Sequence, residues 1–206
     1  MQTREPCTTN LVSPITNTVV IGSEYCVPFP TGLEIVRTLK TFPKLDEFAV
    51  KDVHGNTVFN LQRPSFSAHN RCLLHDNAGN PIVTLRKKRM TAHNRWQIFR
   101  GKSDQINDLL FSVKRPSVFQ LLMTTLELEV FLAKNKTTEE KVYDFKVEGS
   151  WSNGSCDVYS VQSSNIIAQM AKHDIQTTGS ENFVVKVEAN VDSAFIVALI
   201  VILSLE

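Results

Sequence analysis

The densest cluster of charged side chains in this sequence is basic. It lies in the run Arg86, Lys87, Lys88 and Arg89, followed shortly by Arg95. The run directly follows an apolar segment that we expect to be a strand. Arg86 and Lys88 would therefore face one side of the sheet, and Lys87 and Arg89 the other. Two converging cations, joined by Arg95 from the next strand, could hold a multiply charged phosphate through charge-assisted hydrogen bonds. The simpler alternative is a solvated strand end whose charges protect a sheet edge from aggregation.

No other group of side chains has the spacing of a catalytic or metal-binding site. The five histidines are scattered and form no metal-ligand motif. The sequence also lacks a nucleophile-elbow motif and a dinucleotide-binding fingerprint. We therefore predict no catalytic activity, no metal and no cofactor. The net charge is +1, so strong sequence-independent binding to nucleic acid is not expected either.

The most informative element for the fold is the last one, residues 194–205, whose only polar member is Ser204. A helix that is apolar on every side must be surrounded by apolar groups, and Asp192 and Ser193 are residue types that cap a helix start. Such a helix would be about 18 Å long, short of the roughly 30 Å hydrocarbon core of a bilayer. We therefore predict a buried core helix and no transmembrane span, with a buried strand as the alternative because many of these residues are β-branched. The expected core positions are Phe195, Ile196, Leu199, Ile200, Ile202 and Leu203.

The rest of the chain has the pattern of short strands joined by turns. The segments Phe48–Leu61 and Leu73–Leu85 each contain the turn sequence D-x-x-G-N, which is typical of a tight hairpin. Strand-like segments recur up to residue 187, and a long antiparallel sheet tends to close because closure removes its edges. We therefore predict a mainly β fold, a closed antiparallel β-barrel of about ten or more strands around a central, buried C-terminal α-helix. Residues 1–24 are expected to be irregular and residues 25–206 to form this single domain.

Some of these segments carry a family resemblance. Residues 191–202, VDSAFIVALIVI, closely resemble the closing helix of plant LURP-one-related proteins, and the two hairpins and the strand Trp96–Phe99 are similar to that family as well. The resemblance implies a tubby-like fold, a closed barrel of about twelve strands around a central helix, shared with tubby C-terminal domains and phospholipid scramblases. Plant members are linked to basal defence against pathogens, and their biochemical activity is not settled. In tubby domains a basic strand end of similar character carries a phosphoinositide site, which implies an anionic lipid headgroup as a partner here.

Our leading functional hypothesis is a non-catalytic signalling domain that binds such a headgroup at a membrane surface. A phospholipid scramblase-like membrane protein is one alternative, and a protein-interaction or transcription-linked module with a protein partner is another. The cysteines Cys7, Cys26, Cys72 and Cys156 are widely separated, which favours reduced thiols in the cytoplasm over a disulfide framework. We therefore expect a cytoplasmic protein, peripheral at a membrane under the first hypothesis and nuclear under the last.

Overall fold

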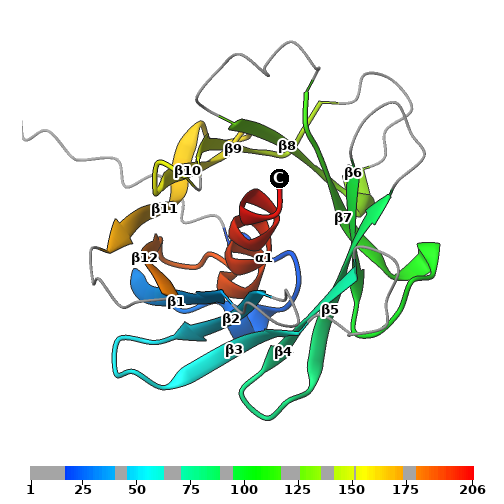
Figure 1. Cartoon of the computed structure of the whole chain (residues 1–206). Helices are drawn as coiled ribbons and strands as arrows, with labels where there is room; N and C mark the ends of the chain where they lie inside the picture. Colours follow the sequence, from blue (N-terminus) through cyan, green and yellow to red (C-terminus); the bar gives the residue numbers. More distant parts are fainter. Residues whose placement is uncertain are drawn as a thin grey trace, which may run out of the picture.

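The strands of the chain close into one antiparallel barrel, seen nearly along its axis in Figure 1. The computed structural model describes residues 17–39, 46–62, 71–88, 95–116, 126–135, 142–150, 152–173 and 180–206. Each of the twelve strands pairs with its neighbours in sequence, and β1 pairs with β12 to complete the ring. The predicted barrel is therefore confirmed. The strands are β1 (Thr31–Leu39), β2 (Asp46–Lys51), β3 (Thr57–Gln62), β4 (Arg71–Asp76), β5 (Pro81–Lys88), β6 (Arg95–Arg100), β7 (Leu109–Lys114), β8 (Leu126–Leu132), β9 (Phe145–Ser150), β10 (Ser155–Ser160), β11 (Asn165–His173) and β12 (Ser180–Val187).

The apolar C-terminal run forms helix α1 (Ser193–Ser204), which occupies the centre of the ring (Figure 1). Every residue from Ala194 to Leu203 is buried, and the six expected core positions lie in this stretch. Phe195 packs against Phe111 of β7 and Phe145 of β9, with ring centroids 5.1 and 5.0 Å apart. Burial of a large apolar side chain contributes about 1.5–3 kcal/mol, so helix and sheet stabilise each other. Within the described ranges, no helix combines the length and hydropathy needed to span a membrane.

Helix α1 begins at a buried carboxylate, that of Asp192. Its Oδ1 accepts a hydrogen bond from the backbone N–H of Phe195 at 3.0 Å, as predicted for a helix cap. Its Oδ2 accepts from three consecutive backbone N–H groups of the N-terminal segment, those of residues 20–22. The segment also contains the short 3₁₀ helix η1 (Ser23–Tyr25) and an isolated bridge between Thr18 and Val191. The predicted domain boundary at residue 25 thus lies within η1, in the N-terminal segment that is bonded to the start of α1. Residues 1–16 lie outside the described ranges.

The two repeated turns adopt the predicted hairpin geometry. Asp52 Oδ1 accepts from the N–H of Asn56 at 2.9 Å, and Asp76 Oδ1 accepts from the N–H of Asn80 at 2.8 Å. The glycine of each turn has φ of +83°, in the left-handed region that glycine favours. Because strands alternate in direction, these turns lie at the end where α1 begins. The last residues of β5 and β7 and the first residue of β6 lie at the opposite end, where α1 finishes.

Candidate functional site

The basic run of β5 divides between the two sides of the barrel wall. Arg86 and Lys88 lie on the outer side, while the buried Leu85 lies on the inner side. The Arg86 guanidinium donates a hydrogen bond to Gln97 Oε1 at 3.1 Å and covers the ring of Phe99 at 4.8 Å from its centroid. Both of these partners belong to β6, so Arg86 lies flat against the outer wall and keeps its charge at the surface.

Lys87, a candidate headgroup residue in the sequence, does not share that surface and lies on the opposite side of the strand, as alternation predicts. Its Nζ lies 2.7 Å from Glu206 Oε1 inside the barrel end, and its side chain is only 17% exposed. The Trp96 Nε1–H donates to the same Glu206 oxygen at 2.6 Å. A cation is favourable at this point because the carbonyl groups at the C-terminus of α1 carry partial negative charge. Lys87 is therefore a structural partner of the helix end, and Arg89 lies outside the described residues.

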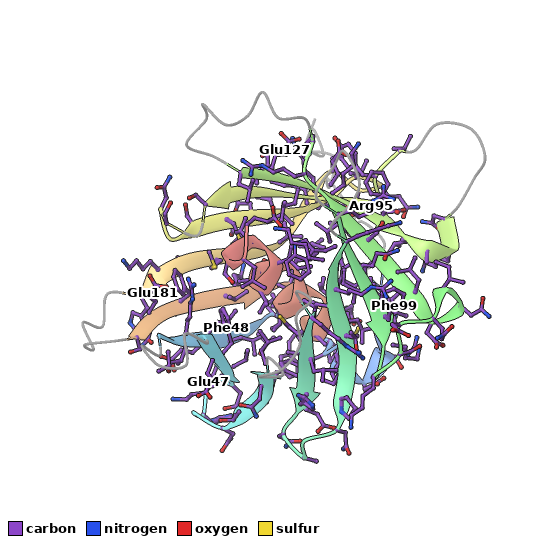
Figure 2. All side chains as sticks on the ribbon, turned by 45° about the vertical axis from the view of Figure 1, so that its right-hand side comes forward. Glu47, Phe48, Arg95, Phe99, Glu127 and Glu181 are labelled. Atoms are coloured by element: carbon purple, nitrogen blue, oxygen red, sulfur yellow. The ribbon has the colours of Figure 1, made fainter. Side chains whose placement is uncertain are left out.

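The outer-facing cations of neighbouring strands line up in two rows. Arg71 of β4 is the cross-strand partner of Arg86, and this pair forms the first row. Lys88 is the partner of Arg95 on β6, which is in turn the partner of Lys114 on β7. We call these residues the cationic wall: Arg71, Arg86, Lys88, Arg95 and Lys114. Figure 2 labels Arg95 of the cationic wall and Phe99, whose ring Arg86 covers, and both residues belong to β6.

Few carboxylates neutralise the cationic wall. Asp104 lies 3.8 Å from Arg86, and Glu129 lies 3.9 Å from Lys114. Among the described residues, Lys88 and Arg95 have no ion pair, and Arg95 contacts only the ring of Phe131, at 5.9 Å from its centroid. Like charges placed directly opposite each other across strands are destabilising. The wall therefore carries an unbalanced positive charge that an external anion would neutralise.

Lys146 of β9 shows what carboxylate partners a structural lysine has elsewhere in this fold. Its Nζ contacts both Glu148 and Glu127, the latter at 2.9 Å. Hydrogen bonds to these two carboxylates raise the pKa of Lys146, with Glu148 as the larger cause. Within the described part of the chain, Lys88 and Arg95 have no such pair of carboxylates.

Arg71 and Lys114 were not among the residues predicted from the sequence. Arg71 meets Arg86 because a register shift between Leu74 and His75 moves the β4–β5 pairing by one residue. Such an irregularity has no clear sequence signature, and without it Arg71 would lie opposite Leu85. Lys114 could have been found by alternation from the buried Val113, once the β6–β7 pairing was assumed. In the described part of the chain, no three His, Cys, Asp or Glu side chains come together as metal ligands would.

The protein is thus a closed antiparallel β-barrel of twelve strands that encloses a C-terminal helix, whose residues 194–203 are all buried. The profile of the LURP-one-related (LOR) proteins matches residues 34–204, and the chain belongs to this family. The family resemblance seen in the closing helix and hairpins is thereby confirmed.

The chain is similar to several proteins from Arabidopsis thaliana. It is 44% identical over 188 residues to Protein LURP-one-related 15, covering 90% of this chain and 84% of that protein. It is 45% identical over 188 residues to Protein LURP1, covering 90% of this chain and 88% of that protein. An X-ray structure of a protein from the same plant superimposes with a TM-score of 0.68 at 40% identity, covering 90% of this chain and 96% of that one.

Proposed function

We propose that this protein is a non-catalytic binding domain that docks at a membrane surface by holding a phosphorylated lipid headgroup on its cationic wall. The observation that supports this proposal is the pair Lys88 and Arg95, which lie opposite each other without a carboxylate partner among the described residues. Paired cations of this kind hold phosphate oxygens by charge-assisted hydrogen bonds, and arginine does so with two parallel donors.

The dimensions of the cationic wall favour a compact ligand with more than one phosphate. Neighbouring strands are about 4.8 Å apart and alternate residues along a strand about 6.7 Å apart. The cation row of Lys88, Arg95 and Lys114 therefore spans about 10 Å, with Arg71 and Arg86 one step further down the wall. This area matches one headgroup with two or more phosphate groups better than it matches an extended polymer.

The overall charge of the protein sets how such a contact would behave. With a net charge of +1, attraction to an anionic surface must come from the local wall and not from the whole molecule. We therefore expect docking that depends on phosphate number and weakens with salt. In this proposal the protein is peripheral at the cytoplasmic side of a membrane and acts in signalling. The proposed biological setting is plant defence against pathogens, an expectation that the family resemblance supports.

Vesicle co-sedimentation tests the proposal. Phosphatidylcholine vesicles are compared alone, with phosphatidylinositol, and with phosphatidylinositol bisphosphate, each at low and high salt. The test variant is Lys88→Ala/Arg95→Ala. The control is Lys134→Ala/Lys186→Ala, which removes the same charge from exposed lysines elsewhere. Because each cation near an anionic surface is worth about 1 kcal/mol, the test variant should bind bisphosphate vesicles roughly tenfold or more weakly.

Three results would overturn the proposal: no sedimentation with bisphosphate vesicles, equal binding to all vesicles, or equal loss in the test and control variants. The same samples address the alternatives. Stable partitioning of the native chain into detergent would favour the scramblase-like alternative. Nuclear accumulation on stimulation, without vesicle binding, would favour the transcription-linked one.

A further inference from the structure

The segment between β6 and β7 folds back over the outer wall beside the cationic wall. We call residues 101–108, which end in the short 3₁₀ helix η2 (Ile106–Asp108), the strap. Among the described residues, three side-chain contacts hold it there. The buried Thr84 hydroxyl donates to Gly101 O at 2.7 Å, and Arg71 Nη2 donates to Lys102 O at 2.6 Å. The third contact joins Asp104 Oδ2 to Arg86 Nη1 at 3.8 Å.

The shape of the strap is fixed by a hydrogen bond to β5 and by hydrogen bonds between its own residues. Gly101 takes a left-handed φ of +56°, and its N–H donates to Ile82 O of β5 at 2.8 Å. Further along, the Ser103 hydroxyl donates to Asp108 Oδ2 at 2.5 Å and accepts from the Gln105 N–H at 3.1 Å. Asp104 lies between the residues joined by these hydrogen bonds, and its side chain is directed toward Arg86 of the first cation row.

We propose that Asp104 is an internal competitor for the anion site, so that a phosphate group bound by Arg86 displaces Asp104 and loosens the strap. This inference rests on the proposed function. A carboxylate is an oxyanion, and it occupies part of the Arg86 guanidinium that a phosphate would need. The two anions repel each other, so both cannot share Arg86 at close range.

The present contact is weak enough to exchange. The Asp104 side chain is 49% exposed and that of Arg86 35%, so water and salt screen their attraction. A doubly charged phosphate that also contacts Lys88 would be the stronger partner. Arg71 and Thr84 would then be the remaining side-chain contacts that hold the strap among those described.

The test compares Asp104→Asn with Asp108→Asn in binding to phosphatidylcholine vesicles that contain phosphatidylinositol bisphosphate. Both variants remove one negative charge from the strap, and both keep an oxygen acceptor. Asp108 contacts Ser103 rather than an arginine, so it controls for net charge. We expect Asp104→Asn to bind about two- to fivefold more tightly than the native chain, the range that an exposed ion pair can supply, and Asp108→Asn to bind much as the native chain does.

Failure of this inference can be told apart from failure of the proposed function. If the native chain binds and Lys88→Ala/Arg95→Ala does not, but Asp104→Asn equals Asp108→Asn, the internal competitor is wrong and the headgroup site stands. If only Asp104→Asn binds, the internal competitor is supported, while docking of the native chain is overturned. If no variant binds, both fall.

Hydrogen exchange gives a second readout that does not depend on affinity. The Ser103 amide donates to Arg100 O at the end of β6, and the Gln105 amide donates to the Ser103 hydroxyl, so both should exchange faster when bisphosphate vesicles are added and the strap loosens. Unchanged exchange of these amides in vesicle-bound protein would contradict displacement of the strap.

Discussion

Lys87 and Lys88 are neighbours with the same charge and very different surroundings. Lys87 points inward and pairs with Glu206, whose side chain is only 2% exposed. Lys88 points outward and is exposed to solvent. The alternation of a strand is enough to separate a structural lysine from the one proposed to bind a headgroup.

The two lysines should therefore differ in what they contribute to folding. Lys87→Ala leaves the buried Glu206 carboxylate without its cation and should lower the free energy of unfolding by about 1–3 kcal/mol. Lys88→Ala removes an exposed charge and should change it by less than about 0.5 kcal/mol. Urea denaturation of the two variants checks this difference. Equal stability would mean that the Glu206 contact does not matter in solution.

Asp192 should give stability a particular pH dependence. Burial raises the pKa of Asp192 above its ordinary value of 3.8, although four backbone N–H donors act in the opposite direction. The folded state therefore binds this proton more tightly than the unfolded state does. The contribution of Asp192 to stability is fully present below pH 3.8 and is lost as the pH rises through the raised folded pKa.

The comparison variant is Asp192→Asn, which cannot titrate. The free energy of unfolding of the native chain, minus that of the variant, should fall as the pH rises from below 3.8 toward neutrality. Chemical denaturation across this range measures it. A difference that stays constant, or grows with pH, would contradict a raised pKa.

The repeated hairpin turns show how much a short motif can specify. The D-x-x-G-N sequence predicted both turns, because an Asp that accepts backbone hydrogen bonds and a left-handed glycine leave few other conformations. The two turns share the same φ of +83° at Gly55 and Gly79.

Gly79→Ala measures how much stability is lost when a residue other than glycine must adopt the left-handed φ of this turn. A Cβ built on Gly79 meets no atom within 4 Å, so the substitution adds no clash. The left-handed φ should still cost about 1 kcal/mol of stability, and Gly79→Asn should cost less because Asn tolerates this region. Thermal unfolding of both variants provides the measurement, and an alanine variant as stable as the native chain would show that the turn relaxes.

The sequence predicted the types of the secondary-structure elements better than it predicted the register in which the strands pair. Periodicity and turn chemistry located the strands, and the Asp192 cap decided for a helix over a buried strand in the last element. The one-residue shift in the β4–β5 pairing, which sets Arg71 opposite Arg86, depends on side-chain packing over the whole ladder. The position of the strap depends on contacts between residues far apart in sequence, such as Arg71 and Lys102. Both features complete the candidate site, and neither has a local signal.

The molecule as a whole depends on an apolar helix enclosed by a sheet that could not close well without it. Phe195→Ala should cost about 3–5 kcal/mol, because the ring is fully buried between Phe111 and Phe145. In native-state hydrogen exchange the α1 amides should be among the slowest of the protein. Fast exchange across residues 194–203 would mean that the helix leaves the barrel readily.

The outer surface of this assembly is where function is proposed, and the most direct measurement is a map of the residues that respond to a ligand. A soluble inositol bisphosphate headgroup is titrated into the labelled protein while backbone amide shifts are followed by NMR. We expect the largest changes at Arg86, Lys88 and Arg95, with further changes in residues 101–105. Changes confined to β8–β10 or to the end where α1 begins, or no changes at all, would contradict the cationic wall as a headgroup site.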